Sequence, residues 1–189
     1  FNPAKPVIIV LGASQGAVRI NDFILDLVPQ LIKNFQILHQ TGVNNFENVS
    51  REAKVLVKEY SFEEKNNYKI VPYFENNIQD AYRAADLIIT RAGSSSIFEV
   101  AAFGKPAIVI PLGSAANNHQ VVNAYEYARA GAAVVIEETN LQPNLVLTQI
   151  KKIVETPGQA QAMAAHALQF AKPDAAQKIA EEIMRAMSK

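Results

Sequence analysis

Residues 7–17 read VIIVLGASQGA, and this stretch decides the fold. Its first half, Val7–Leu11, is a continuous apolar run, which is typical of a strand buried on both faces. Its second half is a turn of small residues that leads into an apolar stripe at helical spacing. The stripe consists of Ile20, Phe23, Ile24, Leu27, Val28 and Leu31. A buried strand, a glycine turn and an amphipathic helix in this order predict the start of a βαβ unit.

The same alternation continues along the chain. We expect further strands at Phe35–His39, Tyr68–Val71, Leu87–Thr90, Ala107–Ile110 and Ala133–Ile136. Helical patterns lie between them, at about 46–60, 78–84, 97–103 and 118–130, and the chain looks helical from Pro143 on, with Pro157 and Pro173 where helices can begin. Six strands alternating with helices suit a doubly wound parallel sheet of order 3-2-1-4-5-6. The prediction is a single Rossmann-like α/β domain over residues 1–189.

Composition excludes several classes of function. The 189 residues carry 18 Lys+Arg against 18 Asp+Glu, and a net charge of zero argues against nucleic acid as a partner. The chain has no cysteine, and no His/Asp/Glu spacing indicates a metal site, so we expect neither metal nor cofactor. The longest apolar runs are strand-sized, too short to span a bilayer, and the polar, Pro-rich start at residues 1–6 is not the pattern expected of a signal peptide. The first residue is Phe1, which predicts a piece cut from something longer.

Two turns rich in glycine and serine follow the strands that this sheet order places side by side. They contain Ser14, Gln15 and Gly16 after the first strand and Gly93, Ser94, Ser95 and Ser96 after the fourth. Ligands of doubly wound sheets bind at this switch point. Each turn opens a helix, whose N-terminus offers free N–H groups and partial positive charge, so two of them suit a diphosphate. The alternative is that the serines only cap their helices.

Polar side chains near these turns are candidates for sugar recognition. Glu99 follows the second turn on an otherwise apolar stretch and could accept hydrogen bonds from two vicinal hydroxyls, as on a ribose, or simply be solvated. Gln120 and Asn123 share a helix face next to His119, where they could bind sugar hydroxyls or merely start a solvated helix. The isolated His39 and His166 are expected to be structural.

The segment GASQG, residues 12–16, also matches the G-x-S-x-G pattern of α/β-hydrolases. Ser14 would then be a nucleophile, with His119 and either Asp80 or Asp86 completing a triad. We disfavour this interpretation because only eleven residues precede Gly12, too few for the upstream loop that supplies the oxyanion hole. A dinucleotide-binding site is disfavoured too, because the pattern is not G-x-G-x-x-G and no acidic residue ends the second strand.

Several ordered blocks carry a resemblance to a known family. They are LGASQGA at 11–17, HQTG at 39–42, YF at 73–74, AYRAADL at 81–87, RAGS at 91–94 with Glu99, HQVVNA at 119–124 and PDA at 173–175. Together they span most of the chain from Val7 to Lys189. The sequence resembles the C-terminal, donor-binding half of glycosyltransferase family 28 enzymes of the MurG type, which transfer N-acetylglucosamine to form lipid II.

The resemblance implies one half of a GT-B fold that holds UDP-N-acetylglucosamine. By position, Ser14, Gln15 and Gly16 would contact the diphosphate region. Phe74 and Glu75 would lie beside the uracil, with the backbone of residue 75 at the edge of the base.

The remaining contacts implied by the resemblance lie on the later helices. Residues 93–96 would line the nucleotide pocket, and Glu99 would bind the ribose hydroxyls. His119, Gln120 and Asn123 would contact the GlcNAc hydroxyls. Arg91 would brace its turn rather than touch substrate.

The family's other half, which binds the lipid-linked acceptor, is not in this sequence. We therefore expect no catalytic residue here, and expect the chain alone to bind donor without turnover. The terminal helix, 173–187, could pack on the sheet or reach toward that N-terminal acceptor domain. The family often has acidic residues before its His-Gln pair, whereas this chain has Asn117 and Asn118, which changes the local charge. The full-length enzyme would be cytoplasmic and peripheral on the inner face of the membrane.

Three other interpretations remain open from the sequence. One is a stand-alone donor-binding subunit of a split GlcNAc-transferase of the dolichol-pathway type, although the start at Phe1 favours a fragment. Another is a different UDP-sugar enzyme of the same fold, such as an epimerase. The last is a nucleotide-binding or interaction module without catalysis.

Overall fold

The computed structural model describes residues 2–12, 17–113 and 118–187. In this part of the chain six parallel strands form one sheet with the order β3-β2-β1-β4-β5-β6. The strands are β1 (Val7–Leu11), β2 (Gln36–Gln40), β3 (Tyr68–Val71), β4 (Leu87–Thr90), β5 (Ala107–Val109) and β6 (Ala133–Val135). The predicted fold class and strand order are confirmed. Residues of β1 and β4 are fully covered, which explains their unbroken apolar sequences.

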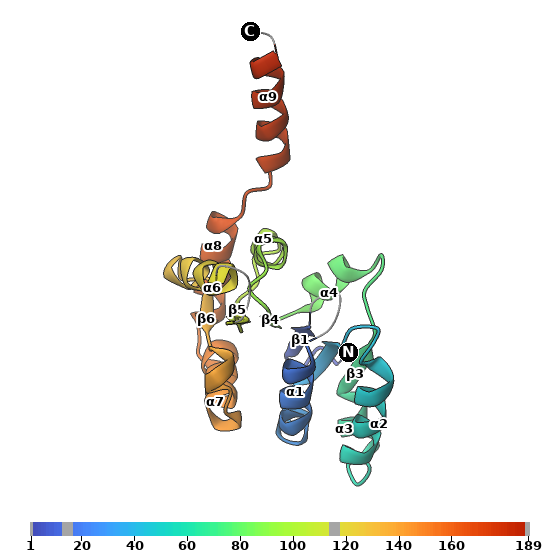
Figure 1. The fold of residues 1–189 in the computed structure, drawn as a ribbon. Coiled ribbons are helices and arrows are strands. Elements are labelled where there is room, and N and C mark those ends of the chain that lie inside the picture. The colour runs from blue at the N-terminus through green and yellow to red at the C-terminus, as the bar shows by residue number, and fades with distance from the viewer. Residues whose placement is uncertain (1, 13–16, 114–117, 188–189) are drawn as a thin grey trace.

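Helices cover both faces of the sheet (Figure 1). One layer contains α1 (Val18–Leu31), α2 (Phe46–Leu56), α3 (Phe62–Asn66) and α7 (Pro143–Glu155). The other contains α4 (Ile78–Ala84), α5 (Ser94–Ala102), α6 (His119–Arg129) and α8 (Gln159–Phe170). Each layer closes its own apolar core against one face, with alternate residues of β1 pointing to each: Ile8 to the first and Ile9 to the second.

The boundaries differ from the predicted ones where local hydrogen bonds decide them. Strand β2 starts one residue late because the N–H of Phe35 donates to Leu31 O and so closes α1. Strands β5 and β6 each end one residue early. The expected helix 46–60 ends at Leu56, and a second helix follows, because Ser61 and Glu64 form a reciprocal capping box. Helix α5 starts three residues before the predicted position, at Ser94.

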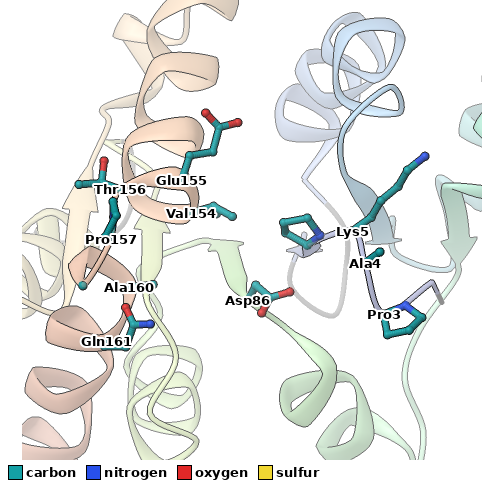
Figure 2. Close-up of a pocket in the computed structure, with 12 residues that line it drawn as sticks. Pro3, Ala4, Lys5, Asp86, Val154, Glu155, Thr156, Pro157, Ala160 and Gln161 are labelled. Carbon is teal, nitrogen blue, oxygen red and sulfur yellow. The ribbon is translucent and has the colours of Figure 1, made fainter.

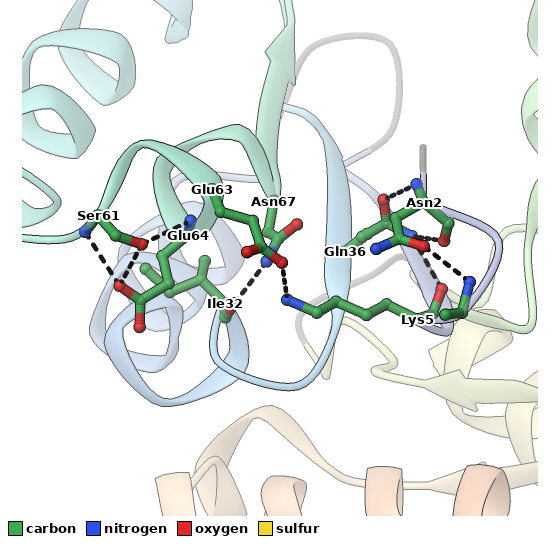
Figure 3. A network of polar contacts seen from close by, with 9 residues as sticks. Asn2, Lys5, Ile32, Gln36, Ser61, Glu63, Glu64 and Asn67 are labelled. Carbon is green, nitrogen blue, oxygen red and sulfur yellow. Dashed lines mark hydrogen bonds and ion pairs between the residues drawn. The ribbon is translucent and has the colours of Figure 1, made fainter.

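A polar network fixes the chain at the amino edge of the sheet (Figure 3). The buried side chain of Gln36 accepts from Asn2 N and donates to the carbonyl oxygens of Asn2 and Lys5. Lys5 reaches Glu63 at 2.9 Å, and Asn67 donates to Ile32 O at 2.8 Å. The start of β1 and the connections into β2 and β3 are thus joined by side chains that satisfy one another.

Helix α9 (Ala175–Met187) stands away from the rest of the molecule (Figure 1). None of its residues is buried, and the apolar side chains of Ile179, Ile183 and Met184 are 61%, 55% and 62% exposed. Of the two arrangements that the sequence left open, packing on this sheet is not the one adopted. Within the described residues, no helix combines the length and the hydropathy that crossing a membrane requires.

Candidate functional site

The glycine-serine turns leave neighbouring strands at one edge of the sheet. Leu11 of β1 is paired with Thr90 of β4, so the segments that follow them start side by side at the carboxyl edge. This is the switch point of the observed strand order, where β1 is flanked by β2 and β4. Ser14, Gln15 and Gly16 lie outside the described residues, whereas the whole second turn is described.

Gly12 is required by close backbone approach. Its N–H donates to Gln40 O at 3.2 Å. A Cβ at this position would lie 3.1 Å from Gln40 O and 3.3 Å from Ala17 N, both backbone atoms that have little freedom to move. Gly12 is therefore held tightly between β2 and the start of α1.

Both helices that follow these turns begin without a capping side chain on the N-cap residue. The N-cap of α1 is Ala17, and that of α5 is Gly93. Ser94 is already the first helical residue, so the interpretation that the serine of the second turn is the N-cap is wrong. Ser94 and Ser95 are exposed, and Ser96 is half-buried. The first N–H groups of a helix need a partner, and an anion is a natural one.

Glu99 has a hydrogen-bond partner on a neighbouring helix that no sequence pattern predicted. Its Oε2 accepts a hydrogen bond from the hydroxyl of Tyr82 on α4 at 2.9 Å. Burial, and then the nearby charge of Glu99, raises the pKa of the Tyr82 phenol, so this hydroxyl stays protonated and can donate. Tyr82 is 2% exposed, whereas the Glu99 residue itself is exposed. The buried Tyr82 hydroxyl thus holds the Glu99 carboxylate, which is expected to bind the ribose hydroxyls.

The segment after β3 is attached to the first turn through Gln40. The N–H of Phe74 donates to the side-chain oxygen of Gln40 at 3.3 Å, while the backbone oxygen of Gln40 receives the N–H of Gly12. The Phe74 ring is only 5% exposed and belongs to the core beneath α4 and α5, whereas Glu75 is exposed. Because the Phe74 ring is buried, a ligand at this position would meet backbone atoms and the exposed Glu75 side chain.

The candidate sugar-contacting residues start α6 and are attached to the neighbouring turns. Gln120 Oε1 accepts the N–H of Leu112 at 3.0 Å, and Asn123 Nδ2 donates to Ala92 O at 3.2 Å. His119 is exposed at the first position of α6, and Asn118 before it has a φ of 54°. The bond from Asn123 brings the start of α6 against the turn after β4. Asn117 lies outside the described residues.

Arg91 braces its turn, as predicted. Its guanidinium donates to Ile110 O at 3.3 Å and forms a 2.6 Å ion pair with Glu138, with side chains only 10% and 15% exposed. Glu138 begins a short 3-10 helix (Glu138–Asn140) after β6, so the pair ties the ends of β4, β5 and β6 together. No motif pointed to Glu138, because an acidic residue after a strand is ordinary on its own.

His39 is a structural residue beneath the carboxyl edge. Its Nδ1 meets the hydroxyl of Tyr68 at 2.8 Å and its Nε2 meets Asn21 Oδ1 at 3.0 Å, while Asn21 donates to Thr41 O. Burial lowers the pKa of His39 to about 3, so the ring is neutral at physiological pH. The network fixes α1, which follows the first turn, to β2 and β3.

The hydrolase interpretation is not supported by these positions. Asp86 lies at the amino end of β4, where it accepts the N–H of Val7 at 2.8 Å, so it is at the opposite edge from His119. Asp80 is exposed on α4 and pairs with Arg83 at 3.0 Å. Within the described part of the chain, no group of three or more His, Asp or Glu side chains could hold a metal ion.

Cavities lie at both edges of the sheet. One of about 340 Å³ is at the amino edge, between the segment that precedes β1 and the connection from α7 to α8 (Figure 2). Two of its polar lining residues, Asp86 and Lys5, are bonded to Val7 N and Glu63. Another of about 410 Å³ is at the carboxyl edge, where Arg19 of α1 faces Val121 of α6 and Glu138. Its lining comes from the start of α1, the segment after β5, α6 and the segment after β6.

Known proteins share the sequence pattern of this chain. The family model described as "Glycosyltransferase family 28 C-terminal domain" matches residues 7–179. Curated relatives named UDP-N-acetylglucosamine--N-acetylmuramyl-(pentapeptide) pyrophosphoryl-undecaprenol N-acetylglucosamine transferase include one from Thermoanaerobacter sp. (strain X514), 38% identical over 95% of this chain and 48% of the relative. One from Leuconostoc citreum (strain KM20) is 31% identical over 97% of this chain and 49% of the relative.

Solved structures share the fold of this chain. The crystal structure of Acinetobacter baumannii MurG matches with a TM-score of 0.81 at 30% identity, over 98% of this chain and 51% of that one. UDP-GlcNAc 2-epimerase from Neisseria meningitidis, solved with UDP-GlcNAc, matches with a TM-score of 0.66 at 16% identity over 97% of this chain and 45% of that one, which shows a shared fold. The chain spans about half the length of these relatives.

Proposed function

Because the chain belongs to the glycosyltransferase family 28 C-terminal domain family, we propose that it is the donor-binding half of a GT-B enzyme. The enzyme would transfer N-acetylglucosamine from UDP-GlcNAc to a lipid-linked acceptor in the synthesis of lipid II and peptidoglycan. The acceptor and the chemistry of its activation belong to an N-terminal domain outside this sequence.

One observation supports the proposal most strongly. Two helices, α1 and α5, begin on the neighbouring strands β1 and β4 without an N-cap side chain. Each helix N-terminus carries about half a unit of positive charge, so a pair of them suits the diphosphate of a nucleotide sugar. The exposed Glu99 on α5 then provides an acceptor for the ribose at one side of the same crevice.

The proposed contacts follow the order of the donor. Residues 14–16, with Ser14, Gln15 and Gly16, would bind the diphosphate, and Gly93 to Ser96 would line the nucleotide. The backbone beside Phe74 and Glu75 would meet the uracil. His119, Gln120 and Asn123 would bind the GlcNAc hydroxyls, two of them already held in place by Leu112 N and Ala92 O.

The chemistry proposed for this half is stabilisation of the leaving group. In an inverting transfer the acceptor hydroxyl attacks the anomeric carbon, the bond from that carbon to the UDP oxygen breaks, and charge develops on the diphosphate. Helix N-termini fixed before the reaction would stabilise that charge without reorganising. The proton of the acceptor hydroxyl needs a base, which we assign to the other domain, so this chain alone should bind donor without turnover.

Helix α9 is the proposed link to that domain. Its stripe of Ile179, Ile183 and Met184 is exposed on a helix that leaves the body of the protein. We propose that the acceptor domain covers it, and that the complete enzyme is cytoplasmic and binds the inner face of the membrane peripherally. Adding the acceptor domain in trans should protect the α9 amides from hydrogen exchange; unchanged exchange would count against the contact.

The ribose assignment is tested with Glu99→Ala. Hydrogen bonds to a charged group contribute about 1.5–3 kcal/mol, so UDP affinity should fall by a factor of about 10 to 100. The substitution also removes the acceptor of the buried Tyr82 hydroxyl, so the free energy of unfolding should fall by about 1–3 kcal/mol, which Tyr82→Phe avoids. An equal loss of stability with unchanged affinity would contradict the assignment.

The sugar assignment is tested with Gln120→Ala. UDP-GlcNAc affinity should fall while UDP affinity stays nearly the same, because the proposed contact is to the sugar. Calorimetric titration with both ligands measures the difference. Parallel losses for both ligands would show that Gln120 only supports the loop through Leu112.

A further inference from the structure

The contact between Tyr82 and Glu99 joins two helices at the proposed ribose site. Tyr82 lies on α4 and Glu99 on α5, and the hydroxyl of the first donates to Oε2 of the second at 2.9 Å. The hydroxyl is therefore directed at the one carboxylate that the proposed function uses to bind the ribose.

The aromatic ring of Tyr82 is fixed by a second contact on the same helix face. It stacks on Phe103 with ring centroids 4.9 Å apart and an interplanar angle of 28°. Phe103 follows Glu99 by four residues, and its N–H donates to Glu99 O at 3.2 Å, so both residues occupy one face at the end of α5. Tyr82 therefore touches the carboxylate with its hydroxyl and the next turn of the helix with its ring.

A glutamate on an exposed helix surface needs this kind of support. Its side chain has several rotatable bonds, and fixing a long polar side chain costs up to about 1.5–2 kcal/mol of conformational entropy when a ligand binds. A hydrogen bond from a buried, immobile donor places the carboxylate before the ligand arrives. Since each carboxylate oxygen accepts more than one hydrogen bond, Oε1 and part of Oε2 stay available for two ribose hydroxyls.

We propose that Tyr82 is a positioning residue that holds the Glu99 carboxylate for the ribose hydroxyls and thereby sets the preference for ribonucleotides over 2′-deoxyribonucleotides. The proposal rests on the proposed function, since it needs a nucleotide at this crevice. It adds the residue that makes Glu99 selective: a freely rotating carboxylate would recover part of its binding energy with a single hydroxyl, whereas a fixed one requires both.

Tyr82→Phe is the direct test because it keeps the ring and its stack on Phe103 and removes only the hydroxyl. We expect UDP affinity to fall about five- to tenfold, because the ligand must then supply most of the entropy cost of ordering the Glu99 side chain. Affinity for 2′-deoxy-UDP should change less than twofold, so the ratio of the two affinities should shrink. A change in that ratio would not follow from a merely structural role.

The protein offers a matched control in Tyr125→Phe. The hydroxyl of Tyr125 donates to Glu137 Oε1 at 2.8 Å, the same chemistry between α6 and the segment after β6, on an exposed tyrosine. This variant should leave both nucleotide affinities unchanged. The double variant Tyr82→Phe with Glu99→Ala should bind UDP no more weakly than Glu99→Ala alone, because the hydroxyl acts only through that carboxylate.

The outcomes separate the inference from the function on which it rests. An unchanged ratio of UDP to deoxy-UDP affinity in Tyr82→Phe, with the ratio lost in Glu99→Ala, would overturn the positioning role and leave the ribose site standing. A ratio unaffected by Glu99→Ala itself would overturn both. A lower melting temperature alone, with the ratio preserved, would assign Tyr82 to stability and contradict the proposal.

Discussion

At the amino edge of the sheet, polar side chains bind the protein's own backbone, whereas at the carboxyl edge two helices start without a capping side chain. Gln36 makes hydrogen bonds to Asn2 and Lys5, Asp86 accepts Val7 N, and Lys105 donates to the carbonyls of Arg83 and Ala85. The α1 and α5 N-caps, by contrast, are alanine and glycine.

The two edges differ in how their polar groups are bonded within the protein. Buried polar groups need partners, and the amino edge supplies them internally, so polar ligands gain little there. At the carboxyl edge, three polar contacts lie beneath the proposed binding surface. They are the ion pair Arg91–Glu138 and the hydrogen bonds from Tyr82 to Glu99 and from Asn123 to Ala92. They hold the second turn and α5 in place, and in the proposed function the start of α5 binds the ligand. Substitutions at the two edges should therefore have different consequences.

The largest effect is expected for Glu138→Ala at the carboxyl edge. It leaves the Arg91 guanidinium buried without its anion, and breaking a buried pair costs about 3 kcal/mol. UDP affinity should fall as well, because Arg91 starts the second turn. The control is Glu126→Ala, which removes an exposed pair with Arg129 and should cost no more than about 0.5 kcal/mol. Urea unfolding measures both, and equal losses would contradict the bracing role.

The corresponding change at the amino edge is Gln36→Leu. It removes the side-chain bonds to Asn2 and Lys5 and should lower the free energy of unfolding by about 2 kcal/mol. UDP affinity, measured below the new melting temperature, should be unchanged because this network lies at the edge opposite the turns. The exposed Gln79 provides the control, Gln79→Leu. A loss of UDP affinity in Gln36→Leu would break the distinction between the edges.

Acidification tests the buried network under the carboxyl edge. In the unfolded chain His39 has a pKa of 6.5, and in the folded protein burial lowers this pKa to about 3. Between these two pH values the unfolded state binds more protons than the folded state, so a fall in pH stabilises the unfolded state. The free energy of unfolding should drop by about 2 kcal/mol from pH 6.5 to pH 5, at 1.36 kcal/mol per unit. His166→Gln, at an exposed site, should keep this slope; a flat profile in the native protein would refute a buried neutral His39.

A smaller effect on stability is expected for Gly12→Ala. The added Cβ would lie 3.1 Å from Gln40 O, and relieving that contact should cost about 1 kcal/mol. Because the shift moves the first turn, UDP affinity should fall by more than the loss of stability suggests. Gly113→Ala is the matched control at the same edge, since its Cβ would meet no described atom within 4 Å. Equal affinities in the two variants would show that the first turn does not bind the nucleotide.

The sheet and its order could be predicted from the sequence because the apolar runs are continuous. Val7–Leu11 and Leu87–Thr90 are buried on both faces, which only a parallel sheet between two helix layers provides. Boundaries were less predictable where single side-chain bonds set them, as at Ser61, whose bond to Glu64 starts a new helix. The arrangement of α9 was open, since its amphipathic pattern does not say what covers it.

The turns of the candidate site could be predicted from the sequence, whereas the residues that hold those turns in place could not. Glycine and serine after β4 and the bracing role of Arg91 could be inferred, because they depend on local chemistry and sheet order. Tyr82 and Glu138 were missed, because each acts through a partner 17 or 47 residues away in sequence. Such pairs leave no local pattern. The contacts proposed for residues 14–16 and the sugar remain predictions.

The proposed function requires that the carboxyl edge of the sheet bind a uridine diphosphate sugar. The most direct measurement is a titration of the purified chain with UDP-GlcNAc, UDP and ATP, followed by calorimetry and melting temperature. At 100 times the dissociation constant, a ligand that binds only the folded state adds about 2.7 kcal/mol of stability. Our expectation is that UDP-GlcNAc and UDP stabilise the chain, that ATP does not, and that Glu99→Ala loses most of the stabilisation by UDP while Gln36→Leu keeps it. Binding of ATP as tight as that of UDP, or binding of UDP that Glu99→Ala leaves intact, would contradict it.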